Sequence, residues 1–488
     1  MLEKVHQDRL KKLEKIRQLG VDPYGGRYDS AEEIAAVLAR FKEGDDSQRA
    51  DAAGRVVLMR SMGKLIFAHI RDQSGQMQIA LRTAKGAEAA ALDEAAWELA
   101  RLLDLGDIVA VEGPLTKTRT GEITIFAEKL TLLCKSLLPM PEKFHGLVDV
   151  ETRYRQRYLD LMTNPEALEA AQKRIAIIEH TRQKLRARGF VEVETPALQP
   201  LYGGAAAMPF VTHHNTLDFD MYLRISPELY LKRLLVGGME KVFEFSRVFR
   251  NEGIDTLHSP EFTMLELYQA YADYEVMMEI TEELISTAAE DICGSTRLPY
   301  GDHEIDYSTP WRRATYEELL AEHAGVAMRD AAAVRAKARE IGFEEANKAD
   351  AVVVNEVFAA TVERHLIQPT FVKDYPAELC PLTRRKADDP GIALRFEPFI
   401  AGTEIGNAYT ELNDPGVQEA NFAFQLDGEA EGETMRVRDE DFLTALRHGM
   451  PPAGGLGIGI DRVVMLLTNR QSIRDVILFP TLRREASE

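Results

Sequence analysis

Two short segments that lie far apart in the chain place the strongest constraint on its fold. Residues 249–252 read Phe-Arg-Asn-Glu and lead, after one short loop, to His-Ser-Pro-Glu-Phe at 258–262. The glycine-rich segment 453–462 lies much nearer the end of the chain and closes with Asp-Arg. Because a guanidinium group binds phosphate or carboxylate through paired hydrogen bonds, Arg250 and Arg462 suggest two arginines on one nucleotide. The fold must therefore bring both segments onto one antiparallel sheet.

The composition indicates a multi-domain globular protein. The chain has 488 residues, of which 45% are hydrophobic, and this suffices for large cores and roughly two to four domains. The net charge of −20 argues against indiscriminate coating of nucleic acid, so no DNA partner is expected. Cys134, Cys293 and Cys380 lack the paired spacing of disulfides or zinc sites. With no leader and no apolar run of roughly 18 residues, we expect a cytoplasmic protein without membrane attachment.

Residues 1–53 are predicted to form an N-terminal helical extension. Within it, Leu10, Leu13, Ile16 and Leu19 form an apolar stripe at helical spacing, flanked by lysines and arginines. Such a helix is either a solvated surface helix or a contact for RNA, and the pattern leaves both open.

Residues 54–135 are predicted to form a five-stranded OB barrel, a fold that commonly binds single-stranded nucleic acid. Short strands are expected at 54–61, 65–72, 76–81, 107–113 and 122–130, with an Ala-rich helix at 87–103 before the fourth strand. Phe67 is a candidate for stacking on a base and Arg60 for binding phosphate. Both could equally be core or surface residues of the barrel.

Residues 136–150 are predicted to be a linker, and 151–488 a larger α+β domain on a mostly antiparallel sheet flanked by helices. A helix is expected at 165–188, and a helical insertion around 274–360. The expected strands lie at 190–194, 216–225, 241–250, 261–271 and 391–411.

The strand that ends at residue 252 places Arg250 and Glu252 on one face, because side chains alternate along a strand. Arg250 could bind both a substrate carboxylate and an α-phosphate, or it could simply form a cross-strand ion pair. In the next strand the shared face carries Phe262, Met264, Glu266 and Tyr268. Phe262 could stack on a purine while the last two line a polar pocket, although an aromatic there is usually a core residue.

The segment 453–462 fails the Gly-x-Gly-x-x-Gly spacing of dinucleotide sites and lacks the Gly-Lys-Ser/Thr ending of a P-loop. Glycines in a strand instead let a ligand or another backbone approach closely. Arg462 is predicted to begin the following helix, aimed at phosphate.

Acidic residues recur at Glu397, Glu404 and Glu411. Carboxylates near a nucleotide usually hold magnesium, so magnesium is the expected cofactor, with more than one ion per site; solvated surface acids are the alternative. Strict alternation puts Asn407, Tyr409 and Glu411 on one face and Glu404 on the other. If all of them line one site, the strand must bulge near Gly406.

These segments resemble class II aminoacyl-tRNA synthetases, and particularly the bacterial lysyl-tRNA synthetases. The resemblance runs from about Arg9 to the end and includes Met-Gly-Lys at 62–64, Thr-His-His-Asn at 212–215 and Pro-Glu-Leu-Tyr at 227–230. Residues 190–196, Phe-Val-Glu-Val-Glu-Thr-Pro, resemble motif 1, which supports a homodimer. The Arg250 and Arg462 segments resemble motifs 2 and 3. The resemblance implies that lysine attacks the α-phosphorus of ATP to give lysyl-adenylate and pyrophosphate, and that lysine then passes to the 3'-terminal ribose of its tRNA.

The resemblance also implies a role for each matching residue. Arg250 and Arg462 would be the catalytic arginines. ATP would bind to Arg250, Glu252, His258, Phe262 and Arg462. Lysine would bind to Gly204, Glu228, Arg250, Glu266, Tyr268, Asn407, Tyr409 and Glu411, with Glu411 and Tyr268 at its ε-ammonium and Glu228 near its α-amino group. Glu397 and Glu404 would hold magnesium. The anticodon would bind to Arg60, Phe67, Gln78 and Glu122.

Two positions depart from the family pattern, and two other functions stay open. Leu257 and Met208 stand where the family often has arginine, and the absence of arginine at position 257 could weaken contact with the γ-phosphate or the acceptor stem.

An aspartyl or asparaginyl relative would share the same folds, but an acidic pocket fits lysine better. A catalytically silent RNA-binding protein would be expected to lose a catalytic arginine or a metal carboxylate, and this chain retains them. The expected partners are lysine, ATP, lysine tRNA and a second copy of the chain.

Overall fold

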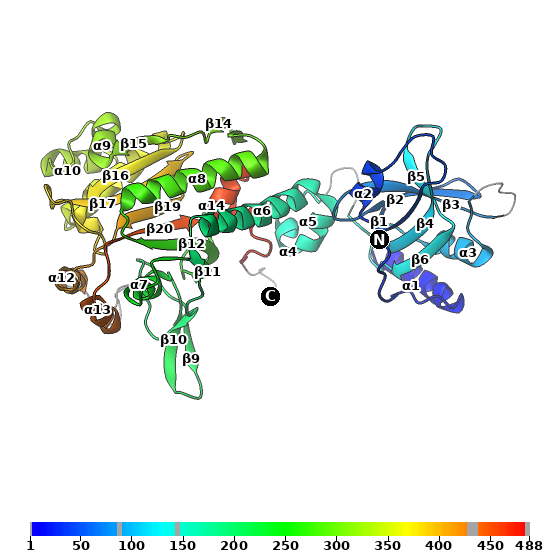
Figure 1. The fold of residues 1–488 in the computed structure, drawn as a ribbon, viewed down its shortest axis with the longest axis horizontal. Coiled ribbons are helices and arrows are strands. Elements are labelled where there is room, and N and C mark those ends of the chain that lie inside the picture. Colours follow the sequence, from blue (N-terminus) through cyan, green and yellow to red (C-terminus); the bar gives the residue numbers. More distant parts are fainter. Residues whose placement is uncertain (1, 85–89, 142–146, 427–437, 484–488) are drawn as a thin grey trace. The chain divides into compact units, whose positions relative to one another are not determined.

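The computed structural model describes residues 2–84, 90–141, 147–426 and 438–483. The chain divides into two compact units, Met1–Val148 and Asp149–Glu488, each with its own core (Figure 1). No helix within the described ranges has the length and apolar composition needed to cross a membrane.

The N-terminal unit is a closed barrel, as predicted. Its strands are β1 (Arg49–Ser61), β2 (Leu65–Arg71), β3 (Gln76–Arg82), β4 (Ile108–Lys117), β5 (Ile123–Phe126) and β6 (Lys129–Cys134). They follow the order β1-β2-β3-β5-β4-β6, and pairing of β1 with β4 closes the ring. The single strand expected at 122–130 divides into β5 and β6, because β5 pairs with both β3 and β4 whereas β6 pairs with β4 alone.

The N-terminal helix is integral to this unit. Leu13 and Ile16 of α1 (Leu2–Gln18) are buried, and Ile16 belongs to the barrel core. The buried Arg9 donates hydrogen bonds to the carbonyls of Leu105, Ser136 and Leu138. The first residues of the predicted linker 136–150 are therefore fixed to the barrel, whereas residues 142–146 lie outside the described ranges.

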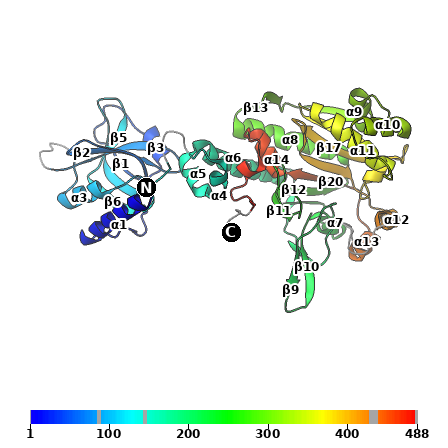
Figure 2. The same cartoon turned by 180° about the vertical axis from the view of Figure 1, so that it is seen from behind.

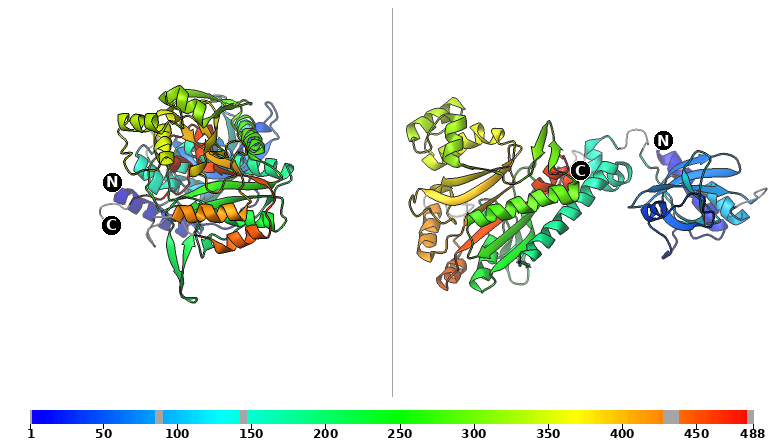
Figure 3. Two further views of the ribbon diagram at one scale, coloured as in Figure 1. Left: turned by 90° about the vertical axis from the view of Figure 1, so that its left-hand side faces the viewer. Right: turned by 45° about the horizontal axis from the view of Figure 1, so that its top comes forward.

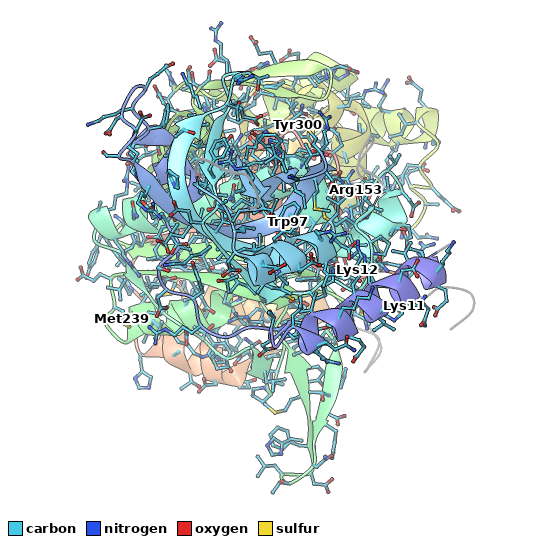
Figure 4. The ribbon with its side chains drawn as sticks, turned by 90° about the vertical axis from the view of Figure 1, so that its right-hand side faces the viewer. Lys11, Lys12, Trp97, Arg153, Met239 and Tyr300 are labelled. Atoms are coloured by element: carbon cyan, nitrogen blue, oxygen red, sulfur yellow. The ribbon has the colours of Figure 1, made fainter. Side chains whose placement is uncertain are left out.

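Part of the basic character of α1 is already neutralised within the unit. Lys12 lies 2.7 Å from Asp104, and Lys11 pairs with Asp8 on the helix surface (Figure 4). The Ala-rich helix is α3 (Glu94–Leu102), which begins after its cap Asp93 rather than at residue 87, a position outside the described ranges. A short helix, α2 (Ile34–Ala39), packs on β3.

The second unit is built on a mostly antiparallel sheet, as predicted. Its order is β15-β16-β17-β19-β20-β12-β11-β7, with β18 paired to β17. The strands are β7 (Val191–Glu192), β11 (Lys241–Phe249), β12 (Glu261–Ala270), β15 (Arg312–Thr315), β16 (Thr370–Pro376), β17 (Ile392–Ile400), β18 (Thr403–Glu404), β19 (Gly406–Thr410) and β20 (Ala453–Gly459). The order makes β20 the direct neighbour of β12 and thereby brings the two arginine segments together.

Long helices cover one face of this sheet. Helices α6 (Pro165–Ala187) and α8 (Tyr274–Cys293) lie side by side across it (Figure 1, Figure 3). Helix α14 (Ile460–Leu467) follows β20 directly and packs beside α6 (Figure 2). These helices bury alternate strand residues such as Leu265 and Leu267 in the largest core cluster. The opposite face of the central strands is left for polar side chains.

The helical insertion expected at 274–360 is more varied than predicted. Helix α8 belongs to the helical layer of the main sheet, and a hairpin of β13 (Arg297–Tyr300) and β14 (His303–Asp306) follows it. Strand β15 then joins the main sheet. Helices α9 (Tyr316–Ala324), α10 (Ala331–Glu340) and α11 (Asp350–Thr361) pack as a group, and their core cluster includes residues of β16 and β17 in the main sheet.

The remaining elements surround the polar face and the sheet edge. Strands β8 (Leu198–Gln199), β9 (Val211–His214) and β10 (Phe219–Leu223) form a separate sheet in which β9 and β10 make a projecting hairpin (Figure 1). The strand expected from Thr216 starts at Phe219, because Asp218 has a positive φ of 53° in the turn. The other helices are α4 (Val150–Arg155), α5 (Arg157–Thr163), α7 (Glu228–Val236), η1 (Glu363–His365), η2 (Ala377–Leu379), α12 (Pro415–Leu426), α13 (Glu440–Arg447) and α15 (Ile473–Val476).

Candidate active site

The polar face of β12 supports two adjoining cavities. Met264 lines both, Phe262 lines the first, and Glu266 and Tyr268 line the second. This is the face predicted from the alternation of side chains. The first cavity has a volume of about 250 Å³ and the second about 280 Å³. Arg250 also lines both, at the point where they meet.

The bulge required near Gly406 is present. Phe396 pairs with Ala408 and Phe399 pairs with Glu404, so three residue steps on β17 face four steps on the neighbouring strand. The extra residue reverses the alternation between β18 and β19. Glu404 and Asn407 therefore both line the two cavities.

The glycines of β20 make room for side chains from the neighbouring strands. Gly455 pairs with Tyr268 on one side and Tyr409 on the other. A Cβ atom at Gly455 would lie 2.0 Å from Oε1 of Glu411 and 2.5 Å from the Tyr268 ring. Gly455 thus permits a close approach to its backbone, and the groups that approach are the buried side chains of Glu411 and Tyr268.

Arg250 and Phe262 form the centre of the first cavity. The guanidinium carbon of Arg250 lies 5.2 Å from the centre of the Phe262 ring. Burial lowers the pKa of Arg250, although neighbouring carboxylates oppose this. Its Nε atom has no hydrogen-bond partner among the described residues. A poorly hydrated guanidinium of this kind gains strongly from an anionic ligand.

Arg462 lies on the far side of the same cavity, in the first turn of α14 as predicted. It donates to the carbonyl oxygen of Glu404 at 2.5 Å, and its other terminal nitrogen lies 3.4 Å from Nε2 of His258. The preceding Asp461 is buried and accepts hydrogen bonds from Arg174 and from the Thr263 amide. Asp461 therefore fixes the start of α14 to β12 and sets the position of Arg462.

The loop between β11 and β12 carries the other residues predicted for ATP. Glu252 and His258 both line the first cavity. Asp255, which the sequence did not single out, accepts hydrogen bonds from the amides of Leu257 and His258 and lies 2.8 Å from Nδ1 of His258. Asp255 thus orients the His258 ring.

Glu397 and Glu404 lie at the junction of the cavities. Glu397 accepts a hydrogen bond from Tyr375 at 2.6 Å and pairs with Arg395. Burial raises the pKa of Glu404, and Glu397 raises it further while Arg462 opposes the shift. Across the described ranges, no group of three His, Cys, Asp or Glu side chains has a geometry suited to a metal ion.

Glu363 is a further acid near this junction that the sequence did not single out. Burial raises its pKa to about 7, and Glu397 and Glu404 add to the shift. Glu363, Glu397 and Glu404 therefore share one electrostatic environment.

The second cavity is acidic and buried. Glu228, at the start of α7, accepts a hydrogen bond from Tyr409 at 2.6 Å. Glu266 accepts from Ser226 at 2.9 Å and from Tyr268 at 3.1 Å. Burial raises the pKa of Glu266 to about 8, and Glu228 contributes to the shift.

Glu411 lies at the floor of this cavity, directly after β19, and is 1% exposed. It does not itself line the cavity, because it pairs with the buried Lys232 beneath Gly455. Burial raises the pKa of Glu411 to about 8, although Lys232 opposes the shift. The sequence shows Glu228 four residues before Lys232, a spacing that allows a helical ion pair. It gives no sign of the second partner, Glu411, which comes from a distant strand.

Gly204 lies at the mouth of the second cavity. Its φ of +83° suits glycine, and a Cβ atom there would lie 3.0 Å from Cβ of Glu228 and from Oγ of Ser226. The structure therefore brings together every residue predicted for the two substrates and for magnesium.

Comparison with known proteins identifies the family. A family model described as tRNA synthetases class II (D, K and N) matches residues 149–483, and one described as an OB-fold nucleic acid binding domain matches residues 52–133. A Lysine--tRNA ligase from Pelotomaculum thermopropionicum is 52% identical over 97% of this chain and 94% of that protein. Those from Moorella thermoacetica and Staphylococcus saprophyticus are 50% and 47% identical, covering 97% and 98% of this chain and the same shares of those proteins. The chain belongs to the lysine–tRNA ligase family.

The residues predicted to bind the tRNA anticodon lie close together on the outer face of the barrel. Arg60 pairs with Phe67 across β1 and β2, and neither belongs to the barrel core, which takes the alternate residues of β2. Gln78 donates to Glu122 at 2.6 Å. His69, which the sequence did not single out, lies 2.6 Å from Glu122 and pairs with Gln78.

The two departures from the family pattern have different environments. Leu257 lines the first cavity and packs against the main core, so an apolar side chain stands where the lysine–tRNA ligases often carry a cation. Met208 is 46% exposed, and its carbonyl accepts a hydrogen bond from the amide of Asn251. The backbone at Met208 thus supports the loop after Arg250, whereas its side chain makes no described polar contact.

Proposed function

We propose that the two adjoining cavities hold ATP and lysine and that Arg250 bridges the two substrates. The observation that carries the proposal is that Arg250 lines both cavities where they meet. A single buried guanidinium there can bind the lysine carboxylate and the α-phosphate together, which places the attacking oxygen next to phosphorus. The products are lysyl-adenylate and pyrophosphate, and lysine then passes to the 3'-terminal ribose of its tRNA.

ATP binding is proposed for the first cavity. Phe262 would stack on adenine, Glu252 would bind the adenine side, and His258 and Arg462 would face the distal phosphates. Catalysis needs no protein nucleophile, because the carboxylate of lysine is the nucleophile and pyrophosphate leaves. The arginines contribute by holding the substrates in line and by stabilising the charge that develops on the phosphates.

The acidic second cavity supports lysine as the amino acid. Glu228 would bind the α-ammonium, and Glu411 and Tyr268 would bind the side-chain ammonium. Gly204, Glu266, Asn407 and Tyr409 would line the remainder. An aspartate side chain would instead place its carboxylate against a buried carboxylate, and asparagine would leave that carboxylate without a cation.

Glu397 and Glu404 fit a magnesium ion. Both offer carboxylate oxygens, and the negative charge of Glu397 raises the pKa of Glu404, a repulsion that a bound cation would relieve. Mg²⁺ is usually bound by one or two carboxylates together with substrate phosphates. When bound, it would neutralise charge on the triphosphate. The chain's own part is to hold the two acids beside Arg250 and Arg462.

The outer face of the barrel is proposed to bind the anticodon. Phe67 would stack on a base, Arg60 would contact the backbone, and Gln78 and Glu122 would hydrogen-bond to base edges. The fixed Gln78–Glu122 pair, 2.6 Å long, supports this role because it presents a preorganised polar edge.

A second copy of the chain is proposed as a partner in the cytoplasm. Segment 190–196 resembles the family's dimer motif, and β7 lies at the edge of the main sheet. Large apolar side chains are exposed at Val191, Leu198 and Val211. Such side chains are typical of a surface that another protein covers. The free state of all three cysteines suits a reducing compartment.

Exchange of pyrophosphate into ATP, measured with each of the twenty amino acids, tests the proposal. Lysine alone should support fast exchange, and Arg250→Ala should abolish it. Exchange driven by aspartate or asparagine would favour the related specificity instead. A protein that binds tRNA but exchanges with no amino acid would be a catalytically silent member of the family.

A further inference from the structure

Lys232 bridges two carboxylates at the floor of the second cavity. It is 1% exposed, and its Nζ atom lies 2.5 Å from Oε1 of Glu228 and 2.5 Å from Oε2 of Glu411. The ammonium also lies 5.2 Å from the centre of the Tyr409 ring and 6.0 Å from that of Tyr268. Burial acts to lower the pKa of Lys232, but the two carboxylates outweigh it and raise the pKa overall. The bridge therefore carries a permanent positive charge.

The bridge determines which carboxylate oxygen faces the cavity. The Nζ atom of Lys232 lies 2.5 Å from Oε2 of Glu411, and neither carboxylate oxygen of Glu411 accepts a hydrogen bond of regular geometry from the described residues. Oε1 lies directly against Gly455, and Gly455 lines the cavity. The ion pair with Lys232 thus holds Oε2 on the far side and leaves Oε1 against Gly455, where a cationic ligand would reach it.

We propose that Lys232 is a positioning residue that sets the length of amino acid accepted, by fixing the separation between Glu228 and Glu411. The proposal rests on the proposed function, in which Glu228 receives the α-ammonium and Glu411 the side-chain ammonium. The two ammonium groups of lysine can then bind Glu228 and Glu411 at the same time. Ornithine, which is one methylene shorter, leaves one buried carboxylate without a partner, and such a loss is costly.

The bridge also explains how three acids share one small cavity. Glu266 faces the same space from β12. The other titratable groups that line the cavity are Arg250, Tyr268, Arg395, Glu397, Glu404 and Tyr409. Without Lys232, like charges on Glu228 and Glu411 would repel, and both side chains would rotate apart or take up protons. The acceptors for the substrate would lose their fixed spacing in either case.

The test replaces Lys232 by methionine in the full-length protein and measures pyrophosphate exchange with lysine and with ornithine. In Lys232→Met, KM for lysine should rise on the order of tenfold, and the ratio of kcat/KM for lysine over ornithine should fall on the order of tenfold. KM for ATP should change by less than about twofold, because Lys232 lines neither cavity. The pH profile of lysine KM should move to higher pH, since the acids lose their internal cation.

Lys135→Met is the matched control. Lys135 is also fully buried and bridges two carboxylates, Asp104 and Asp107, but it belongs to the N-terminal unit. It should leave both lysine KM and the ornithine ratio unchanged even if it lowers the melting temperature. Thermal unfolding of both variants separates loss of stability from loss of selectivity.

Three results would overturn the proposal. One is a folded Lys232→Met protein with an unchanged ratio of lysine to ornithine. Another is a lower KM for lysine, which would mean that Lys232 competes with the substrate ammonium. If the methionine variant does not fold, Lys232→Arg takes its place, because arginine keeps the charge with a wider head group. This variant should lower the ratio of kcat/KM for lysine over ornithine on the order of fivefold. An unchanged ratio in Lys232→Arg is the third refuting result. Wild-type protein without lysine-dependent exchange would instead reject the proposed function itself.

Discussion

Binding of lysine should release protons from the second cavity. Burial raises the pKa of Glu266 and of Glu411 to about 8 each, with Glu228 adding to the first shift and Lys232 opposing the second. A carboxyl group with a pKa of 8 is about nine-tenths protonated at pH 7 and about one-quarter protonated at pH 8.5. A substrate ammonium favours the ionised form. Glu266 should therefore lose its proton as lysine binds, whereas Glu411 already faces the ammonium of Lys232.

The direction of the pH effect follows from these raised pKa values. Glu266 holds its proton below about pH 8 in the free protein and ionises as the pH rises, so lysine should bind more tightly at higher pH. The ionised fraction of one such acid rises about eightfold between pH 7 and 8.5, and KM for lysine should fall by about that factor. Burial raises the pKa of Tyr268 and Tyr409 as well, so neither titrates in this range. KM for ATP should stay nearly constant.

Titration calorimetry measures the protons directly. Lysine is titrated into the protein at pH 7 in two buffers of different ionisation enthalpy, and the difference in heat gives the number released. We expect about one proton per site, and a count near zero in Glu266→Gln. A count near zero in the wild-type protein, together with a KM for lysine that is flat from pH 7 to 8.5, would refute the reasoning, because Glu266 would then be ionised before the substrate arrives.

Three further predictions concern single positions. Glu411→Gln should lower kcat/KM for lysine on the order of a hundredfold with little change in KM for ATP, since it removes the charge that meets the ammonium; exchange kinetics for both substrates check this. Phe67→Ala should weaken aminoacylation of tRNA on the order of tenfold but leave pyrophosphate exchange intact; equal losses in both assays would contradict a role confined to tRNA. Gly455→Ala would place a methyl group 2.0 Å from Oε1 of Glu411 and should abolish lysine-dependent exchange; near-normal kinetics would show that the carboxylate can move aside.

The faces of the central strands could be predicted from sequence because alternation is a local property. Met264, Glu266 and Tyr268 share the polar face of β12, and the bulge near Gly406 was required once Glu404 and Asn407 were assigned to one site. Arg462 could likewise be placed at a helix start from its position after the glycine-rich segment. Each inference needs only the chain within a few residues of the side chain.

Contacts between distant segments could not be predicted in this way. Lys232 lies in an ordinary amphipathic helix, and nothing nearby in sequence indicates that Glu411, from another strand, completes its bridge. The same limit applies to helix α1 of the barrel. In the sequence Arg9 is one basic residue among several, and only the structure shows that it binds three carbonyl groups. The role of Asp255 could not be predicted for a different reason: acidic residues in loops are common and are usually solvated.

The arrangement of acids in the second cavity favours binding of a cationic ligand at a cost to the stability of the folded protein. Glu228, Glu266 and Glu411 are buried close together, and Lys232 supplies one internal cation for the group. Burying acids without enough cations costs free energy, and burial accordingly raises the pKa of both Glu266 and Glu411. A ligand with two ammonium groups at the right spacing can pair with these acids. A neutral or shorter amino acid cannot do so, and we therefore expect selectivity for lysine to depend on pairing these acids with two ammonium groups more than on the shape of the cavity.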